Sequence, residues 1–273
     1  MTDQTSGPTA GDGQVQVRLD QREGGVVAFV VLDNARRLNV MNSALMEGFV
    51  ATLAELADNE ALRAVVLTGA GDRAFVGGAD VDEMAAIASP DAARSFILKV
   101  HACCRAVRDL PVPVIARVNG YCLGAGLELA AACDLRVASL GSTFGMPEVK
   151  LGIPSVVEAA LLPGLVGWGR ARQMLLLGET FGAAEARAWR LIEEACPAAE
   201  IDLTVERWLA ALMTSTPKAV RLQKALIRRW EDLPLTEAIA AGVEAFADAY
   251  RSDEPAQAMQ AFQDARAARR GGG

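Results

Sequence analysis

Apolar and polar residues alternate near the start of the chain, and this pattern soon gives way to continuous apolar runs. Residues 15–19 alternate, two glycines follow, and residues 26–32 are almost wholly apolar. This pattern predicts a β-hairpin whose second strand is buried. Short apolar runs over 64–68, 114–118 and 135–138 predict three further buried strands, each followed by turn residues.

Helical periodicity appears between these runs. Apolar residues recur at helical spacing over 45–56, where Asn42 or Ser43 can cap the helix, and residues 92–109 are also helical in pattern. From residue 159 onward the pattern is nearly all helical, with breaks at glycine and proline. The alternation predicts an α/β core of repeated strand-strand-helix units, followed by a helical C-terminal region.

The predicted organisation has three parts. Residues 1–13 are polar and glycine-rich, lack the apolar stretch of a signal peptide, and are predicted to be a disordered tail. Residues 14–200 form the predicted core, and 201–270 the C-terminal helices. The chain contains no run of eighteen apolar residues, so we expect no membrane span and a cytoplasmic location.

Charge and rare residues narrow the function classes. The chain has 27 basic and 34 acidic residues, a net charge of −7, so we expect no nucleic-acid partner. The five cysteines are odd in number and lack C-x-x-C spacing, which favours reduced thiols. His101 is the only histidine and no nucleophile motif points to it, so it is interpreted as a surface or interface residue.

Three segments rich in small residues carry candidate chemistry. Residues 74–80 read Ala-Phe-Val-Gly-Gly-Ala-Asp, and an Asp80-x-x-Glu83 signal starts the next helix. Such turns expose backbone N–H groups that can hold an anion or a polarised carbonyl. The second segment places Glu128 just after Gly-Ala-Gly, and the third contains Glu148. Two carboxylates beside such turns can activate one water between them.

Each feature also has an ordinary explanation. The first segment can be a simple tight connection. Glu128 can merely stabilise the helix dipole, and a loop residue such as Glu148 is usually inert. The glycines at 124 and 126 lack the third small residue of a dinucleotide fingerprint, so NAD binding is disfavoured.

Together, however, the segments resemble the enoyl-CoA hydratase/isomerase (crotonase) superfamily over residues 15–265. The motifs that carry the resemblance are Arg37-Leu-Asn-Val-Met-Asn42, Arg73-Ala-Phe-Val-Gly-Gly-Ala-Asp80, Val118-Asn-Gly-Tyr-Cys-Leu-Gly-Ala-Gly-Leu-Glu128, Ala132-Cys-Asp-Leu-Arg-Val-Ala138 and Phe144-Gly-Met-Pro-Glu-Val-Lys-Leu-Gly152. The resemblance implies a spiral of ββα units whose C-terminal helices build a trimer, often doubled to a hexamer.

The resemblance also implies a reaction and its residues. An acyl-CoA thioester would be hydrated from the 2-enoyl to the 3-hydroxyacyl form, without a metal and with no cofactor beyond the coenzyme A of the substrate. Backbone N–H groups of Ala79 and Ala125 would form the oxyanion hole. Glu128 would help to deprotonate the water and Glu148 would protonate the α-carbon. Further substrate-binding positions are Leu38, Asn39, Gly78, Asp80, Val81, Gly124 and, on the last helix, Phe262.

Residues 153–160 depart from the family's glycine-rich stretch. Val156 and Val157 are bulkier, which leaves the acyl substrate open. Glu158 is interpreted as a surface glutamate at a helix start, with a third catalytic acid as the alternative. The alternatives for function are another crotonase-type reaction on an acyl-CoA (isomerase, hydrolase or C–C lyase) and a non-catalytic CoA-binding or RNA-binding member.

Overall fold

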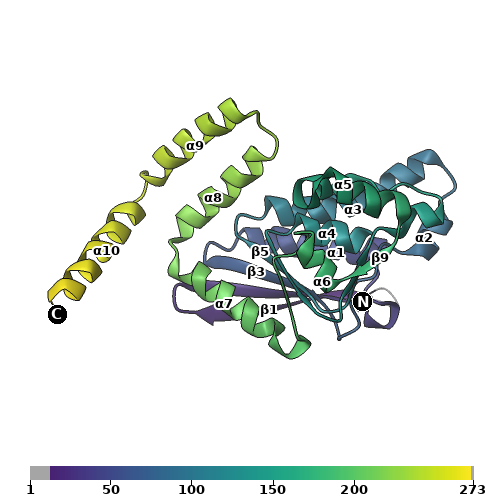
Figure 1. Ribbon diagram of the computed structural model, residues 1–273, viewed down its shortest axis with the longest axis horizontal. Helices are drawn as coiled ribbons and strands as arrows, with labels where there is room; N and C mark the ends of the chain where they lie inside the picture. Colours follow the sequence, from purple (N-terminus) through teal and green to yellow (C-terminus); the bar gives the residue numbers. More distant parts are fainter. Residues whose placement is uncertain (1–12, 272–273) are drawn as a thin grey trace, which may run out of the picture.

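The computed structural model describes residues 13–271, so nearly all of the predicted N-terminal tail lies outside the described residues. The chain forms an α/β body from which the last three helices extend as an arm (Figure 1). Among the described residues, no helix is both long enough and apolar enough to cross a membrane.

A six-stranded sheet forms the centre of the body. Its strands, in spatial order, are β1 (Gln14–Arg22), β2 (Gly25–Asp33), β3 (Leu62–Gly69), β5 (Val114–Val118), β7 (Leu135–Ser139) and β10 (Glu194–Cys196). The β1–β2 hairpin is antiparallel and all other neighbours are parallel. The hairpin and the three buried strands predicted from the apolar runs are therefore confirmed.

A second, four-stranded sheet was not predicted. It consists of β4 (Ala74–Val76), β6 (Tyr121–Leu123), β8 (Thr143–Gly145) and β9 (Thr180–Gly182). The segment 74–80, interpreted as a turn, begins with β4, and the region from residue 159 onward, predicted to be nearly all helical, contains β9 and β10. Each is three residues long, which is too short to establish an alternating pattern in the sequence.

The two sheets are joined by repeated units. In β3–β4, β5–β6 and β7–β8, the first strand joins the large sheet and the second joins the small one. A helical segment follows each pair, which confirms the predicted ββα spiral. The helices of the body are α1 (Ser43–Ala57), α2 (Val81–Ala85), α3 (Pro90–Asp109), α4 (Ala125–Ala132), α5 (Leu162–Leu177) and α6 (Ala183–Ala188), with short 3₁₀ turns η1 (Ala35–Arg37), η2 (Pro147–Leu151), η3 (Val157–Leu161) and η4 (Ala198–Glu200).

Alternate residues of the large sheet bury opposite faces. Val30 and Leu67 pack in the cluster that includes α1, α3 and α4, whereas Val27 and Val66 face α7 (Ile201–Thr214). This alternation follows from the period of two along a strand. The sheet is therefore covered on both faces, as expected for parallel strands.

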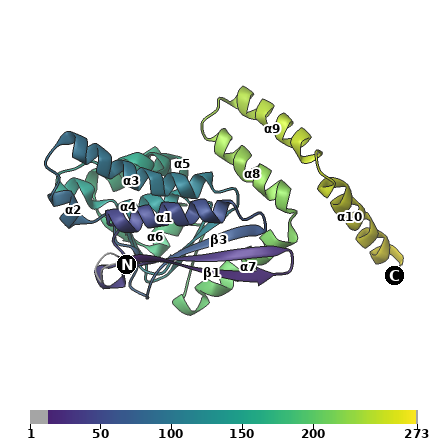
Figure 2. The same ribbon diagram turned by 180° about the vertical axis from the view of Figure 1, so that it is seen from behind.

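The C-terminal arm consists of α8 (Pro217–Trp230), α9 (Leu235–Ala249) and α10 (Glu254–Gly271). Lys224 ties α8 to the body, because its buried ammonium donates to Asp134 and to the carbonyls of Val107 and Val112. Both views show α9 and α10 leading away from the body (Figures 1 and 2).

Candidate functional site

A cavity of about 600 Å³ lies where the small sheet, α3 and α4 meet. It brings together most of the residues predicted as a site: Gly78, Ala79, Val81, Gly124, Ala125, Glu128 and Glu148. Its other walls are mainly apolar and come from Met84, Ile87, Phe96, Ile97, Val100, Leu151, Ile153 and Val156. The cavity thus combines a few polar groups, which also include Arg94 and Ser155, with apolar walls that suit a hydrocarbon group.

The Ala79 N–H lies in a turn that hydrogen bonds hold on both sides. The Met41 N–H donates to the Gly78 carbonyl at 2.9 Å, and the Asp80 N–H donates to the Met41 carbonyl at 3.1 Å. Gly78 has a φ of 125°, which favours glycine at this position. Between these bonds, the Ala79 N–H has no hydrogen-bond partner among residues 13–271 and is available to an oxygen in the cavity.

The Ala125 N–H is the first of helix α4. The Gly124 N–H is tied to the Gly145 carbonyl at 2.9 Å, and the Gly124 carbonyl accepts from the N–H groups of Leu127 and Glu128. Within the described part of the chain, the Ala125 N–H is left unpaired. Because it lies at the N-terminus of α4, the helix dipole adds to its attraction for negative charge.

Two glycines allow this turn to form. Gly124 has φ 51° and ψ −123°, and a Cβ there would come within 2.5 Å of Glu148 Oε1. A Cβ on Gly126 would collide with the carbonyl of Val76 in β4. The turn therefore needs glycine at both positions, for backbone conformation at the first and for close packing of α4 at the second.

Glu128 lies in the first turn of α4 and is only 4% exposed. Its Oε1 accepts a hydrogen bond of 3.2 Å from the Ala159 N–H. The pKa of Glu128 is raised to about 8, mainly by burial and then by the nearby charge of Glu148, while the hydrogen bond from the Ala159 N–H acts in the opposite direction.

Glu148 approaches from the opposite wall. It lies on the 3₁₀ turn η2 rather than in an irregular loop, and it is half-buried. The Ser155 hydroxyl donates to its Oε2 at 2.7 Å, while Oε1 faces Gly124. The sequence did not single out Ser155, since an isolated serine before two valines carries no motif.

Glu158 is not the surface residue that the sequence suggested. It is 7% exposed, at the beginning of η3, and its Oε1 lies 2.8 Å from Nδ1 of His101. His101 is half-exposed on α3, as expected, but is paired with this buried carboxylate. The helix-start pattern around Glu158 did not reveal its burial, because the side chain turns toward α3.

Four predicted binding residues lie apart from the cavity lining. Asn39 is fully buried and binds the loop after β3, where its amide donates to Ala70 and Ala74. Asp80 caps α2 and pairs with Arg37. Leu38 has a left-handed φ of 56° and its carbonyl accepts from the Gly77 N–H. Phe262 is exposed on α10, in the arm.

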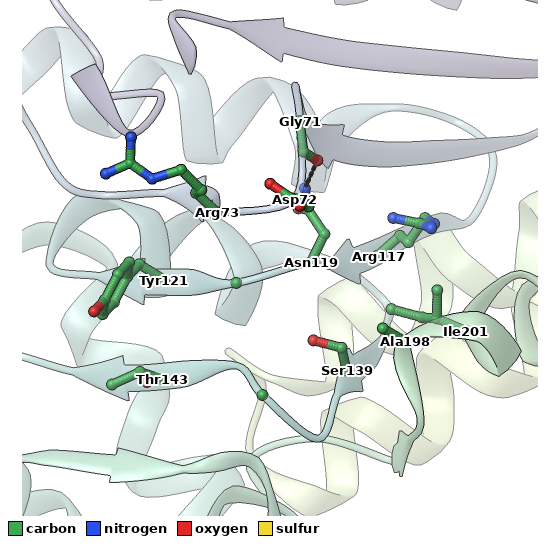
Figure 3. Close-up of a pocket in the computed structure, with 12 residues that line it drawn as sticks. Gly71, Asp72, Arg73, Arg117, Asn119, Tyr121, Ser139, Thr143, Ala198 and Ile201 are labelled. Carbon is green, nitrogen blue, oxygen red and sulfur yellow. Dashed lines mark hydrogen bonds between the residues drawn. The ribbon is translucent and has the colours of Figure 1, made fainter. Parts of the chain in front are cut away.

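A separate cavity of about 470 Å³ opens between the ends of the two sheets (Figure 3). Arg73, Tyr121, Ser139 and Thr143 line it, and neither proposed carboxylate does. The Asn119 amide in its wall donates to the carbonyls of Gly69 and Gly71, so it fastens the loop after β3. Because this cavity lacks both carboxyls in its lining, the first cavity remains the candidate site.

The chain is similar to known proteins over most of its length. A family model described as enoyl-CoA hydratase/isomerase matches residues 22–271. The chain belongs to this family. It is 34% identical over 239 residues to the short-chain-enoyl-CoA hydratase of Clostridium acetobutylicum, covering 87% of this chain and 91% of that protein. It is 30% identical to the crotonyl-CoA hydratase of Syntrophomonas wolfei, covering 89% and 93% of the two chains.

Solved structures of the family share its fold. An enoyl-CoA hydratase from Bacillus anthracis matches with a TM-score of 0.85 and 29% identity, over 91% of this chain and 96% of that one. One from Mycobacterium smegmatis matches with a TM-score of 0.86 and 28% identity, over the same shares. The predicted crotonase fold is therefore confirmed.

Proposed function

We propose that this member of the family is an enoyl-CoA hydratase, which adds water across the double bond of a 2-enoyl-CoA thioester. One observation carries the proposal: the N–H groups of Ala79 and Ala125, which have no partner among residues 13–271, line the same cavity as the carboxyls of Glu128 and Glu148. The names of relatives at 30–34% identity support it. Both kinds of group promote water addition to a conjugated thioester, the N–H groups by stabilising the enolate oxygen and the carboxyls by transferring protons.

The N–H groups would act on the thioester carbonyl. Hydrogen bonds from Ala79 and Ala125 draw electron density toward the carbonyl oxygen, so the β-carbon becomes electrophilic and the enolate formed by water addition is stabilised. A fixed donor of this kind contributes about 3 kcal/mol to transition-state stabilisation. The enolate is transient, because a proton then reaches the α-carbon and gives the 3-hydroxyacyl thioester.

The carboxyls would share the proton chemistry. One ionised carboxylate takes a proton from the attacking water, and one protonated carboxyl delivers a proton to the α-carbon. The sequence interpretation gave the first role to Glu128. Its pKa of about 8 favours the reverse in the free site, where Glu128 keeps its proton at pH 7 and Glu148 receives the proton of the water.

The apolar walls would hold the acyl group. Side chains of Phe96, Ile97 and Val156 offer no charge or hydrogen bond to this part of the substrate. Coenzyme A is part of the substrate in this proposal, and the residues of the site perform the reaction without a further cofactor. The bulk of residues 153–156 sets the room at the distal end.

A direct assay tests the proposal. Purified protein is incubated with crotonyl-CoA and with longer straight-chain enoyl-CoAs, and the loss of conjugated-thioester absorbance and the gain of one water in product mass are followed. Glu148→Gln is expected to lower kcat by about 10²–10⁴-fold. Glu55→Gln, at an exposed position on α1, serves as the matched control. Absence of turnover with every chain length contradicts the proposal.

We also propose that the protein assembles as a trimer or a hexamer. Large apolar side chains follow one side of α9, and each is more than 60% exposed: Leu235, Ile239, Val243 and Phe246. A helix that leads away from its own body with such a stripe is expected to pack against another copy. Light scattering is expected to give the mass of three or six chains, and a monomer contradicts this.

The cysteines support a cytoplasmic location. All five are free thiols, and four of them are buried. A chain that keeps five unpaired cysteines suits a reducing compartment. Fractionation of cells that express the tagged full-length protein tests this proposal, and recovery outside the cytoplasm contradicts it.

A further inference from the structure

One short segment contacts both proposed carboxyls. The Ser155 hydroxyl donates to Glu148 Oε2 at 2.7 Å, and four residues later the Ala159 N–H donates to Glu128 Oε1 at 3.2 Å. The 155–159 segment therefore determines where both carboxyl groups point. A shift of this segment by about 1 Å is enough to cost about a hundredfold in rate.

The backbone of the 155–159 segment is strained. Val157 has a φ of 39°, in the left-handed region. A β-branched residue is a genuine outlier there, because its side chain crowds the backbone. Such a conformation persists only where surrounding contacts hold it, and these residues cluster at functional sites. The segment must therefore be anchored by something beyond its own preferences.

Glu158 provides the anchor. It follows Val157 directly, is 93% buried, and its Oε1 lies 2.8 Å from Nδ1 of His101 on α3. Its Oε2 is buried without a hydrogen-bond partner in the described part of the chain. Burying a carboxylate costs free energy. If Glu158 only capped a helix, its side chain would be expected at the surface instead. Glu158 is also absent from the cavity lining and thus does not face the substrate.

We propose that the His101–Glu158 pair is a positioning device for the hydration reaction. By fixing Glu158 to α3, the pair holds the 155–159 segment where Ser155 and Ala159 donate to the two carboxyls. This inference rests on the proposed hydratase function for its catalytic consequence. Glu158 is thus a positioning residue and not a third catalytic acid.

The electrostatics agree with this placement. Burial is the main cause that raises the pKa of Glu128, followed by the charge of Glu148, and the charge of Glu158 acts in the same direction. Glu158 is therefore near enough to Glu128 to influence it. Cys104, on α3, is a deeply buried thiol whose pKa is raised by burial and then by the charges of Glu158 and Glu128, so the thiol stays uncharged.

Two variants of Glu158 and two of His101 test this proposal. Glu158→Ala removes the anchor and is expected to lower kcat for crotonyl-CoA by about tenfold to a hundredfold. KM is expected to change less than about twofold, since the residue does not line the cavity. Glu158→Gln keeps an oxygen that accepts from Nδ1–H and is expected to restore most of kcat. His101→Asn keeps a donor near the position of Nδ1, whereas His101→Ala does not, and the same order is expected.

The matched control is Arg105→Ala. Arg105 lies one turn further along α3, is exposed, and pairs with Asp109 of the same helix. It is expected to leave kcat and KM unchanged. Circular dichroism of each variant separates a local effect from failure to fold, and the conservative variants provide the test if Glu158→Ala does not fold.

Hydrogen exchange measures how firmly the 155–159 segment is held, independently of catalysis. Peptides that span residues 153–162 report the Ala159 N–H, and they are expected to exchange faster in Glu158→Ala and His101→Ala than in the parent. Unchanged exchange, or faster exchange with unchanged kcat, overturns the inference. If the parent protein shows no hydration, the proposed function fails, while the exchange result still decides whether the pair holds the segment.

Discussion

The N–H half of the proposed site and its carboxyl half are built from different kinds of structure. Ala79 and Ala125 follow the short strands β4 and β6, and backbone hydrogen bonds hold both turns, with Met41 on either side of Ala79 and from the Gly124 N–H to the Gly145 carbonyl of β8. In the carboxyl half, by contrast, the Ser155 side chain donates to Glu148 of η2, and the Glu158 side chain in η3 pairs with His101 of α3. The first half depends on backbone conformation, and the second depends on particular side chains far apart in the chain.

The two halves are therefore expected to be sensitive to different mutations. A backbone donor survives most substitutions that keep the turn, so its weak points are glycines such as Gly124. The carboxyl half is sensitive at residues that never touch the substrate, such as Glu158. The carboxyl half also lowers the stability of the folded state, since Glu128 is a buried acid and Val157 has a left-handed backbone.

The largest expected effect is on stability, and it concerns the carboxyl half. The pKa of Glu128 is raised from its ordinary value of 4.5 to about 8 in the folded state. Between these values the folded chain holds a proton that the unfolded chain has lost, so this group's contribution to stability falls as pH rises through this window. The loss is complete above pH 8 and amounts to at most about 5 kcal/mol.

Glu128→Gln removes this dependence, and its side-chain oxygen can still accept from Ala159. The variant is expected to gain stability over the parent between pH 5 and pH 9, as measured by urea denaturation at both values. Glu55→Gln, on the exposed side of α1, corrects for the loss of one negative charge. If the difference in stability between Glu128→Gln and the parent is the same at pH 5 and pH 9, ionisation of Glu128 does not destabilise the fold.

The same contrast explains what the sequence could predict. The glycines at 78 and 124 indicate tight turns before helices, and the resemblance to the family's motifs assigns the N–H groups of Ala79 and Ala125 to these turns. The small sheet was not, because its strands are three residues long. The His101–Glu158 pair joins residues 57 positions apart, and Val157 adopts a conformation against its own preference. Tertiary contacts decide both, and a local pattern does not encode them.

The next effect concerns Gly124, where the two halves meet. Gly124→Ala would force a side chain into the space of Glu148 Oε1 and strain a backbone with φ 51°. We expect kcat to fall by about a hundredfold, because one carboxyl and one N–H donor move together. Gly141→Ala is the control, since a Cβ there meets no atom within 4 Å. Equal activity of the two variants would mean that the halves are not coupled at this turn.

The smallest expected effect isolates one side-chain contact in the carboxyl half. Ser155→Ala removes the hydroxyl that donates to Glu148 Oε2 but leaves the Ala159 N–H on Glu128. A hydrogen bond to a charged group contributes about 1.5 kcal/mol or more, so kcat is expected to fall by about tenfold. Ser155→Thr restores a hydroxyl and is expected to recover much of the loss. The control is Ser95→Ala, whose hydroxyl donates to a backbone carbonyl on the exposed side of α3. If Ser155→Ala behaves like this control, the backbone of η2 alone orients Glu148, and the carboxyl half is as firmly built as the N–H half.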